Sequence, residues 1–247
     1  MEELNVSLKD KGNSAPGMDD VSYGMLKNLP ISAKIAMLKT YNGCLGGDPI
    51  PGSWKKYNVL PILKPNKNPD NVNNLRPIVL SSCYCKTLEI MIKNCLDFLL
   101  EKNSFFGRLQ SGFRKGMSIH NNIAFLTTQV QLAFKQGETI LAIFLDIKSA
   151  YDNVNIYKLF NKLNQINVPM ELSNLIFRIL QNRLLYTKKS DGSYLGPVLA
   201  TSGLPQGSPL STILFNVYTA DLFKTLSSDV PLMRYADDLV IIELQLR

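Results

Sequence analysis

Residues 231–244 read Pro-Leu-Met-Arg-Tyr-Ala-Asp-Asp-Leu-Val-Ile-Ile-Glu-Leu. Two short runs of β-forming residues, Pro231–Arg234 and Leu239–Leu244, flank a central Tyr-Ala-Asp-Asp sequence. Alternating strand and turn signals of this kind are typical of two antiparallel strands joined by a tight turn. The pattern therefore predicts a β-hairpin that presents Asp237 and Asp238 at its tip.

A further carboxylate stands at the end of another β-rich run. Residues Thr139–Leu145 read Thr-Ile-Leu-Ala-Ile-Phe-Leu, and Asp146 follows directly. A continuous apolar run favours a strand buried in the centre of a sheet. Carboxylates at strand ends are oxygen ligands of the kind that Mg²⁺ prefers, and two ions about 3.5–4 Å apart suit a phosphoryl transfer. The alternative is ordinary turn chemistry for the Asp-Asp pair and a strand-end cap for Asp146.

A basic hairpin is expected earlier in the chain. The strand-like runs Tyr57–Lys64 and Arg76–Leu80 flank Pro65–Leu75, which is rich in Pro, Asn and Lys. Such a composition is typical of an exposed tip between two strands. Lys64 and Arg76 would then lie on the two arms, where cations placed over a carboxylate–metal centre neutralise a triphosphate. The alternative is a solvated charged surface.

A stiff loop, Gly203-Leu-Pro-Gln-Gly-Ser-Pro209, comes before the last predicted helix. Its glycines allow the backbone to approach a ligand closely, and its prolines restrict the backbone. The start of a helix also attracts anions. The alternative is a purely structural loop that caps the helix.

Helices alternate with these strands along the whole chain. Apolar residues at helical spacing predict helices at about 32–45, 86–100, 120–134, 156–165, 170–183 and 208–226. Asp191-Gly192, between two β-rich runs, predicts another hairpin. We therefore expect an α+β fold in which helices pack against an antiparallel sheet.

The positive charge of the chain is unevenly distributed. The 247 residues carry a net charge of +7, and residues 51–120 alone hold 11 basic and 4 acidic side chains. Positive charge that served only solubility would be spread evenly along the chain. The distribution favours a local patch for an anionic partner such as nucleic acid, nucleotide phosphates or acidic lipid.

Several classes of protein can be set aside. No apolar run approaches the roughly 18 residues of a membrane span, and the acidic, polar start is not typical of a signal peptide. The four cysteines form no Cys-x-x-Cys pair and His120 is the only histidine, which argues against a zinc site, a disulfide framework or a histidine-based hydrolase. A reducing compartment fits this cysteine usage.

Taken together, the motifs resemble the reverse transcriptase domain of non-LTR (LINE-type) retrotransposons. Six sequence blocks occur in the order found in that family. They are Ser14–Asp20 and Leu75–Leu80 in the fingers, Gln110–Lys115, Phe144–Val154 (motif A), Ser202–Ser211 (motif B) and Tyr235–Leu239 (motif C). The resemblance covers roughly residues 14–240.

The resemblance implies roles for individual residues. Asp146 and Asp237 would be the main catalytic, metal-binding carboxylates and Asp238 the neighbouring third one, while the carbonyl of Ile147 would contribute a metal oxygen. Tyr151 matches the aromatic steric gate that lies under the sugar and favours dNTPs. The remaining nucleotide-binding positions would be Arg76 and Lys64 at the triphosphate, and Gln206 and Gly207 at the templating and incoming nucleotides. Phe113 and Arg114 would support fingers structure or contact the template.

The family also implies an architecture and an activity. It implies a right-hand polymerase fold with 1–138 mainly fingers, 139–247 mainly palm and no thumb, because only Leu239–Arg247 follow the Asp-Asp pair. It implies RNA-directed DNA synthesis with two Mg²⁺ ions, or Mn²⁺, on template RNA and a DNA primer. We expect thumb and endonuclease regions elsewhere in the parent element, and localisation to a cytoplasmic ribonucleoprotein and the nucleus. The alternative is a catalytically silent, nucleic-acid-binding remnant.

Overall fold

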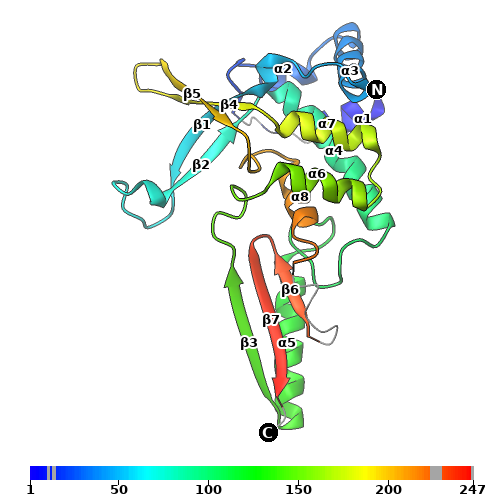
Figure 1. The fold of residues 1–247 in the computed structure, drawn as a ribbon, viewed down its shortest axis with the longest axis vertical. Coiled ribbons are helices and arrows are strands. Elements are labelled where there is room, and N and C mark those ends of the chain that lie inside the picture. The colour runs from blue at the N-terminus through cyan, green and yellow to red at the C-terminus, as the bar shows by residue number, and fades with distance from the viewer. Residues whose placement is uncertain (10–11, 13–14, 223–229, 246–247) are drawn as a thin grey trace. The chain divides into compact units, whose positions relative to one another are not determined.

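The computed structural model describes residues 1–9, 12, 15–222 and 230–245 (Figure 1). The chain packs into two compact units. Unit 1 comprises Met1–Cys95 and Tyr151–Ser211, and unit 2 comprises Leu96–Ala150 and Thr212–Arg247. The division into mainly fingers and mainly palm at residue 138 stays a prediction.

Unit 1 is built on a four-stranded sheet with the order β2-β1-β4-β5. Its strands are β1 (Lys56–Leu63), β2 (Leu75–Leu80), β4 (Arg183–Lys188) and β5 (Tyr194–Ala200). The β1–β2 and β4–β5 pairs are antiparallel, so both predicted hairpins are confirmed. The β1–β4 pair is parallel, which departs from the expected wholly antiparallel sheet. A long connection between the two hairpins permits this arrangement, since parallel strands need a crossover.

The helices of unit 1 pack against one another in pairs. They are α1 (Glu2–Lys9), α2 (Tyr23–Lys27), α3 (Ile31–Gly46), α6 (Ile156–Gln165), α7 (Met170–Leu180) and the first part of α4 (Cys83–Lys102), with short 3₁₀ turns η1 (Gly52–Lys55) and η2 (Val72–Asn74). The pairs are α1–α2, α3–α7 and α6–α7, and the first part of α4 is buried on nearly all sides. Leu159, Leu175 and Ile176 are almost fully buried where α6 and α7 pack together. These positions follow the helical apolar spacing of the sequence.

A buried and a half-buried cation, Arg183 and Lys55, satisfy backbone carbonyls of unit 1. Arg183 is 3 % exposed, and its guanidinium donates to the carbonyls of Leu180 and Gly203, each at 2.8 Å, and to that of Ser202. The ammonium of Lys55 donates to the carbonyl of Gln181 at 2.6 Å, and burial lowers the pKa of Lys55 to about 8. These contacts explain why α7 ends at Leu180 and not at Arg183: the arginine caps the helix from the next strand.

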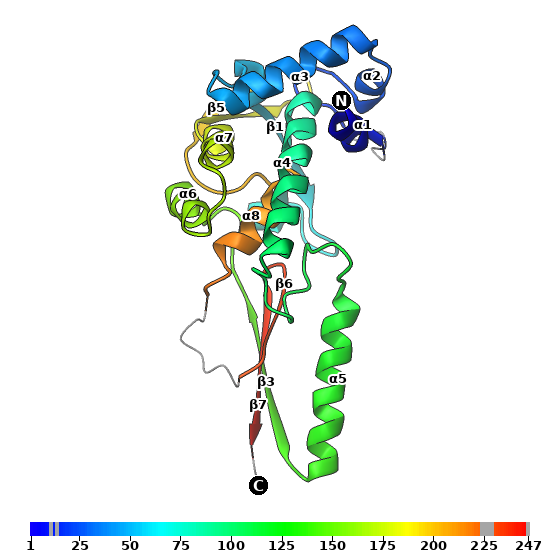
Figure 2. The same cartoon turned by 90° about the vertical axis from the view of Figure 1, so that its right-hand side faces the viewer.

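Unit 2 contains a three-stranded antiparallel sheet with the order β3-β7-β6. Its strands are β3 (Thr139–Asp146), β6 (Leu232–Tyr235) and β7 (Asp238–Gln245), and its helices are α5 (Ile119–Gln136) and α8 (Ser211–Tyr218), which starts in unit 1. Helix α5 lies along one face of this sheet (Figures 1 and 2). The last predicted helix, 208–226, is confirmed only over α8, and residues 223–229 lie outside the described residues.

The expectation that residues Thr139–Leu145 form a buried central strand is wrong. Strand β3 lies at the edge of its sheet, and among the described residues only β7 pairs with it. Leu141, Ile143 and Phe144 are 42 %, 43 % and 67 % exposed. An apolar run identifies a strand but does not determine its position in a sheet, because that depends on which distant segments pair with it.

In the part of the chain that the structure describes, no helix combines the length and the apolar character needed to cross a membrane. This agrees with the absence of a long apolar run in the sequence.

We expect Arg183→Met to lower the free energy of unfolding of unit 1 by about 1–3 kcal/mol, because the buried carbonyls of Leu180 and Gly203 lose their donor. Urea unfolding followed by the fluorescence of Trp54, the single tryptophan and a buried residue of unit 1, measures this change. Lys188→Met, on the exposed end of the same strand, is the control and should shift stability by less than about 0.5 kcal/mol. Equal unfolding midpoints for the two variants would contradict this role of Arg183.

Candidate active site

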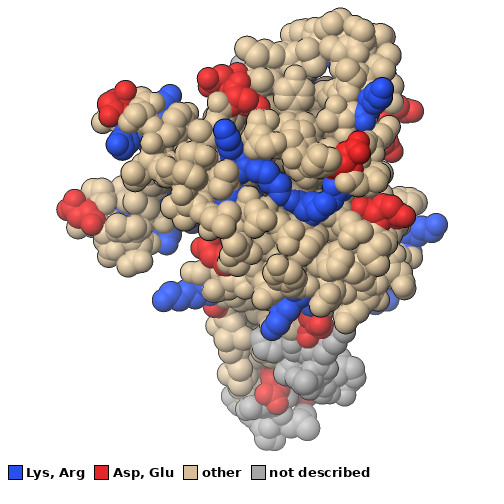
Figure 3. All heavy atoms as spheres, turned by 45° about the horizontal axis from the view of Figure 1, so that its top comes forward, with Lys and Arg blue, Asp and Glu red and all other residues tan. Residues whose placement is uncertain are grey.

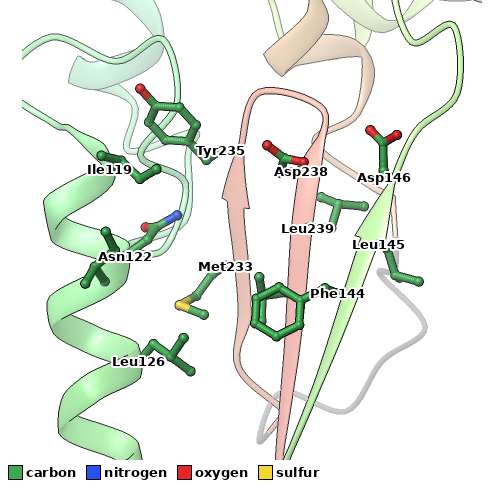
Figure 4. A pocket seen from close by; sticks show the side chains of 12 residues that line it. Ile119, Asn122, Leu126, Phe144, Leu145, Asp146, Met233, Tyr235, Asp238 and Leu239 are labelled. Carbon is green, nitrogen blue, oxygen red and sulfur yellow. The ribbon is translucent and has the colours of Figure 1, made fainter. Parts of the chain in front are cut away.

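The acidic residues of unit 2 meet where β3 ends and β7 begins. Asp146 is the last residue of β3, Asp238 is the first residue of β7, and the two are direct partners in the antiparallel register. Figure 4 shows their carboxylates side by side at the ends of neighbouring strands. Asp237 lies in the turn of the β6–β7 hairpin, and its carbonyl accepts a hydrogen bond from the Ile147 amide at 3.3 Å. The predicted hairpin is therefore confirmed.

The carboxylates affect one another electrostatically. Partial burial raises the pKa of Asp238, and the negative charges of Asp237 and then Asp146 raise it further. A like charge nearby disfavours ionisation in this way. Asp238 is therefore close enough to Asp237 and to Asp146 to be repelled by each, and a cation bound there would offset this repulsion.

The oxygen donors at this position fit a divalent cation by their chemistry. Asp146 and Asp238 supply carboxylates from two adjacent strands, and hard cations such as Mg²⁺ prefer oxygen ligands. Among residues 1–9, 12, 15–222 and 230–245, no three His, Cys, Asp or Glu side chains converge into a metal-binding group. The register places Asp238 directly opposite Asp146, whereas Asp237 occupies the turn. The metal-binding roles of Asp146, Asp237 and Asp238 stay a prediction.

A cavity of about 340 Å³ opens beside the carboxylates in unit 2. Side chains of α5 and of all three strands line it, and Figure 4 shows Leu126, Met233 and Phe144 among them, with Asp146 and Asp238 at one end. Most of the lining is apolar. The carboxylates thus border a space between α5 and the sheet that the described side chains do not fill.

A buried polar network supports the hairpin turn from behind. The side-chain amide of Gln110 donates to Asn216 Oδ1 at 3.0 Å, and Asn216 Nδ2 donates to the carbonyl of Gly112 at 2.8 Å. Gln110 and Asn216 are 2 % and 1 % exposed. A Cβ atom added at Gly112 would overlap the backbone nitrogen of Ala236, so only glycine fits against the turn. The network fixes the chain immediately before Asp237.

Sequence reasoning did not identify this supporting role. The Gln110–Lys115 block matches a family motif, but no pattern in the sequence indicates a role for Asn216, which lies on an apolar helix. Arg114, from the same block, forms a bidentate ion pair with Glu101 at 2.7 and 2.8 Å and donates to the carbonyls of Gly107 and Gln110. These contacts favour the structural alternative for Arg114 over a template contact.

The predicted triphosphate residues lie in the β1–β2 hairpin of unit 1. Arg76 is exposed in β2, opposite Ile62. Lys64 follows β1, and its ammonium donates to the carbonyl of Asn73 at 2.9 Å within the hairpin. Arg76 therefore offers an accessible guanidinium, whereas the side chain of Lys64 is engaged in holding the hairpin tip.

The motif B loop lies against the same hairpin. The carbonyl of Gln206 accepts a hydrogen bond from the amide of Val79, in β2, at 2.7 Å. Gly207 has a φ of 119°, in the left-handed region, and a Cβ there would come within 2.7 Å of the Val79 carbonyl oxygen. Glycine is required at this position by both conformation and space.

Tyr151 is joined to the other end of this loop. Its carbonyl accepts a hydrogen bond from the amide of Leu204 at 2.8 Å, and its side chain is half-buried. Unit 1 thus brings together the predicted nucleotide-binding residues Lys64, Arg76, Tyr151, Gln206 and Gly207. Unit 2 holds Asp146, Ile147, Asp237 and Asp238.

The basic excess of residues 51–120 divides between the two units. Seven of the 11 cations belong to unit 1 and four to unit 2. Lys55, Lys86 and Arg114 make internal hydrogen bonds to backbone carbonyls and are not surface charges for a partner. On the face drawn in Figure 3, Lys and Arg side chains form a short band near the centre and are otherwise interspersed with Asp and Glu. The local patch expected from the sequence is thus limited to the cations that remain exposed.

Gly112→Ala should loosen the turn that carries Asp237, because the added methyl group overlaps the Ala236 backbone and such overpacking costs about 1–3 kcal/mol. We expect amide hydrogen exchange of residues 232–241 to accelerate about tenfold. Gly107→Ala, in the same loop, is the matched control, since a Cβ at Gly107 meets open space. Identical exchange in the two variants would show that the Gly112 contact does not hold the turn.

A sequence model of the family described as reverse transcriptase (RNA-dependent DNA polymerase) matches residues 62–244. A probable RNA-directed DNA polymerase from transposon BS of Drosophila melanogaster is 31% identical over 90% of this chain and 24% of its own length. The RNA-directed DNA polymerase from mobile element jockey of Drosophila funebris is 27% identical over 98% of this chain and 27% of its own length. The chain spans about a quarter of the length of these two relatives.

The fold is shared with a solved polymerase structure. Apo telomerase from Candida tropicalis superposes with a TM-score of 0.57 at 14% sequence identity, over 87% of this chain and 44% of that chain. This confirms the expected α+β reverse transcriptase fold. Because the family model spans most of the chain and the relatives come from mobile elements, as the six sequence blocks predict, the chain belongs to the reverse transcriptase family, in the group of the non-LTR retrotransposons.

Proposed function

We propose that this chain catalyses RNA-directed DNA synthesis, in which a dNTP is added to the 3′-OH of a primer paired with template RNA. The pairing of Asp146 with Asp238 at the ends of two adjacent strands is the observation that carries the proposal. Phosphoryl transfer depends on positioning and charge neutralisation and needs no protein nucleophile. Paired carboxylates and an exposed arginine meet these needs.

Asp146, Asp237 and Asp238, with the carbonyl of Ile147, would hold two divalent cations, Mg²⁺ or Mn²⁺. When bound, such cations neutralise phosphate charge and favour ionisation of the attacking hydroxyl. The rigid strands fix Asp146 and Asp238 in register, so these side chains need little rearrangement to bind. Partial burial, and then the negative charges of Asp237 and Asp146, raise the pKa of Asp238, and the nearness of these charges supports the assignment.

The residues of unit 1 would bind the nucleotide. The exposed guanidinium of Arg76 suits the triphosphate, because guanidinium groups form paired hydrogen bonds to phosphate oxygens. Lys64 would contribute positive charge from the hairpin tip. The backbone at Gln206 and Gly207 would line the pocket for the templating and incoming nucleotides, and the Tyr151 ring would lie under the sugar and exclude a 2′-OH.

Template RNA and a DNA primer are the partners that this activity requires. Exposed cations of both units would contact the phosphate backbone, so binding should weaken as salt concentration rises. We also propose that the protein acts in a cytoplasmic ribonucleoprotein and in the nucleus, which its similarity to mobile-element polymerases supports. Thumb and endonuclease regions would be supplied elsewhere in the parent element.

Asp146→Asn and Asp237→Ala should each reduce extension of a primed RNA template by about 100-fold or more, because each removes an anionic oxygen ligand where charge develops. A gel assay with labelled primer and dNTPs measures this. Glu243→Gln removes an exposed carboxylate from β7, the strand that follows Asp237, and should retain full activity. Unchanged extension by the two aspartate variants would refute the metal assignment. Salt-sensitive RNA binding without extension by any form would instead favour the silent remnant.

Tyr151→Ala should admit ribonucleotides, because it removes the ring assigned to exclude the 2′-OH. The ratio of kcat/KM for rNTP to that for dNTP is expected to rise about 10–100-fold, as for the loss of a packing contact against a substrate group. Tyr151→Phe keeps the ring and should keep discrimination. If Tyr151→Ala discriminates as well as the unaltered chain, this tyrosine is not the gate.

A further inference from the structure

Glu89, in α4, is a buried carboxylate that lies outside the site described above. Its side chain is 0 % exposed. Burying a carboxylate costs free energy unless hydrogen bonds or opposite charges compensate it. The groups that contact Glu89 therefore indicate what it does.

The main partner of Glu89 belongs to the motif B loop. Ser208 Oγ donates a hydrogen bond to Glu89 Oε2 at 2.8 Å, and Cys85 Sγ lies 3.8 Å from Glu89 Oε1. Ser208 Oγ also accepts a hydrogen bond from the amide of Leu210 at 3.2 Å. A buried carboxylate on a helix thus holds the serine that shapes the end of this loop.

Ser208 directly follows two predicted nucleotide-binding residues, so its contact with Glu89 affects their backbone. Gln206 and Gly207 immediately precede it, and Gln206 is held on the other side by its hydrogen bond from Val79. The loop backbone is therefore attached to β2 at Gln206 and to α4 at Ser208, with only Gly207 between the two attachments. Loss of the α4 attachment would leave the glycine free to move.

We propose that Glu89 is a positioning residue that fixes the Gln206–Gly207 backbone for the incoming nucleotide, acting through Ser208. The inference rests on the proposed function, because it names the residue that positions the backbone of the same nucleotide site. Glu89 touches no nucleotide itself. Its effect is on the geometry of the loop, which should appear in nucleotide affinity more than in the rate of the chemical step.

The surroundings of Glu89 make its hydrogen bond with Ser208 sensitive to pH near neutrality. The charged and titratable side chains that face it are Tyr23 of α2, Tyr57 of β1, Cys85 and Lys86 of α4 and Arg183 of β4. Burial, the largest influence, raises the pKa of Glu89 from 4.5 to about 7, although the Ser208 hydrogen bond and Lys86 oppose it. An ionised carboxylate accepts the Ser208 hydrogen bond more strongly than a protonated one.

A rise in pH has opposite effects on two properties, the folding stability of the chain and the strength of the Ser208–Glu89 hydrogen bond. The pKa of Glu89 is higher in the folded chain than in the unfolded chain, so the folded chain binds this proton more tightly. The resulting contribution to folding stability is complete below about pH 4.5 and is lost as pH rises through about 7. The Ser208 contact strengthens over the upper part of the same window. Glu89→Gln keeps the size and an acceptor but cannot titrate, so it removes both dependences.

Amide hydrogen exchange of residues 203–210 in the full chain tests the anchor without requiring activity. Glu89→Leu and Ser208→Ala should accelerate this exchange about tenfold or more, as expected for the loss of a hydrogen bond to a charged group. Glu89→Gln should stay close to the unaltered chain. Glu171→Leu, on the exposed side of α7, is the matched control and should change nothing in this segment. Unchanged exchange in both Glu89→Leu and Ser208→Ala overturns the proposal, and Ser208→Ala decides it alone if Glu89→Leu does not fold.

Steady-state primer extension tests the consequence for the nucleotide. Glu89→Leu and Ser208→Ala should raise the KM for dNTP about tenfold with a smaller change in kcat, and Glu89→Gln should restore KM. As pH rises from 6 to 8, the KM of the unaltered chain for dNTP should fall relative to the KM of Glu89→Gln. Accelerated loop exchange with an unchanged KM overturns the positioning role. If the unaltered chain extends no primer, the proposed function fails, and loop exchange still decides whether Glu89 anchors the loop.

Discussion

The antiparallel pairing of β3 with β7 is the constraint on which the candidate site depends. It runs along the whole of both strands and sets Asp146 directly opposite Asp238. A slip of one residue would turn one of the two carboxylates to the opposite face of the sheet. The register is supported from outside the strands, because Gly112 packs on the backbone of Ala236 and the Gln110–Asn216 pair fixes Gly112. The buried polar network therefore holds the β6–β7 hairpin in place, and with it the acidic residues at its turn.

Both units fix their functional loops with hydrogen bonds from buried or half-buried polar side chains. In unit 1, Arg183 and Glu89 hold the two ends of the motif B loop, at Gly203 and at Ser208. In unit 2, Arg114 and Asn216 hold the loop that supports the hairpin turn. Ionic side chains in the interior are costly, so they persist where a specific backbone conformation is needed. Arg114 is also one of the cations of residues 51–120 that make internal hydrogen bonds, as Lys55 and Lys86 do.

The sequence was informative where a pattern is local. The Tyr-Ala-Asp-Asp hairpin and the β1–β2 hairpin follow from strand and turn signals in neighbouring residues, and both are confirmed. The edge position of β3, the parallel β1–β4 pair and the roles of Asn216 and Glu89 depend on partners distant in the chain. Periodicity cannot reveal such partners, because a buried polar residue on an apolar helix looks the same whatever it contacts. The individual roles of the site residues follow from family resemblance and stay predictions.

We propose above that the paired carboxylates form a metal-dependent polymerase site. The most direct test incubates the full chain with a primed RNA template and all four dNTPs, with and without Mg²⁺, and follows the length of the labelled primer. We predict stepwise extension that needs Mg²⁺ and stops when the cation is chelated. A primer that stays at its original length with Mg²⁺ present, while the chain binds the primed template, would contradict a polymerase site at these carboxylates.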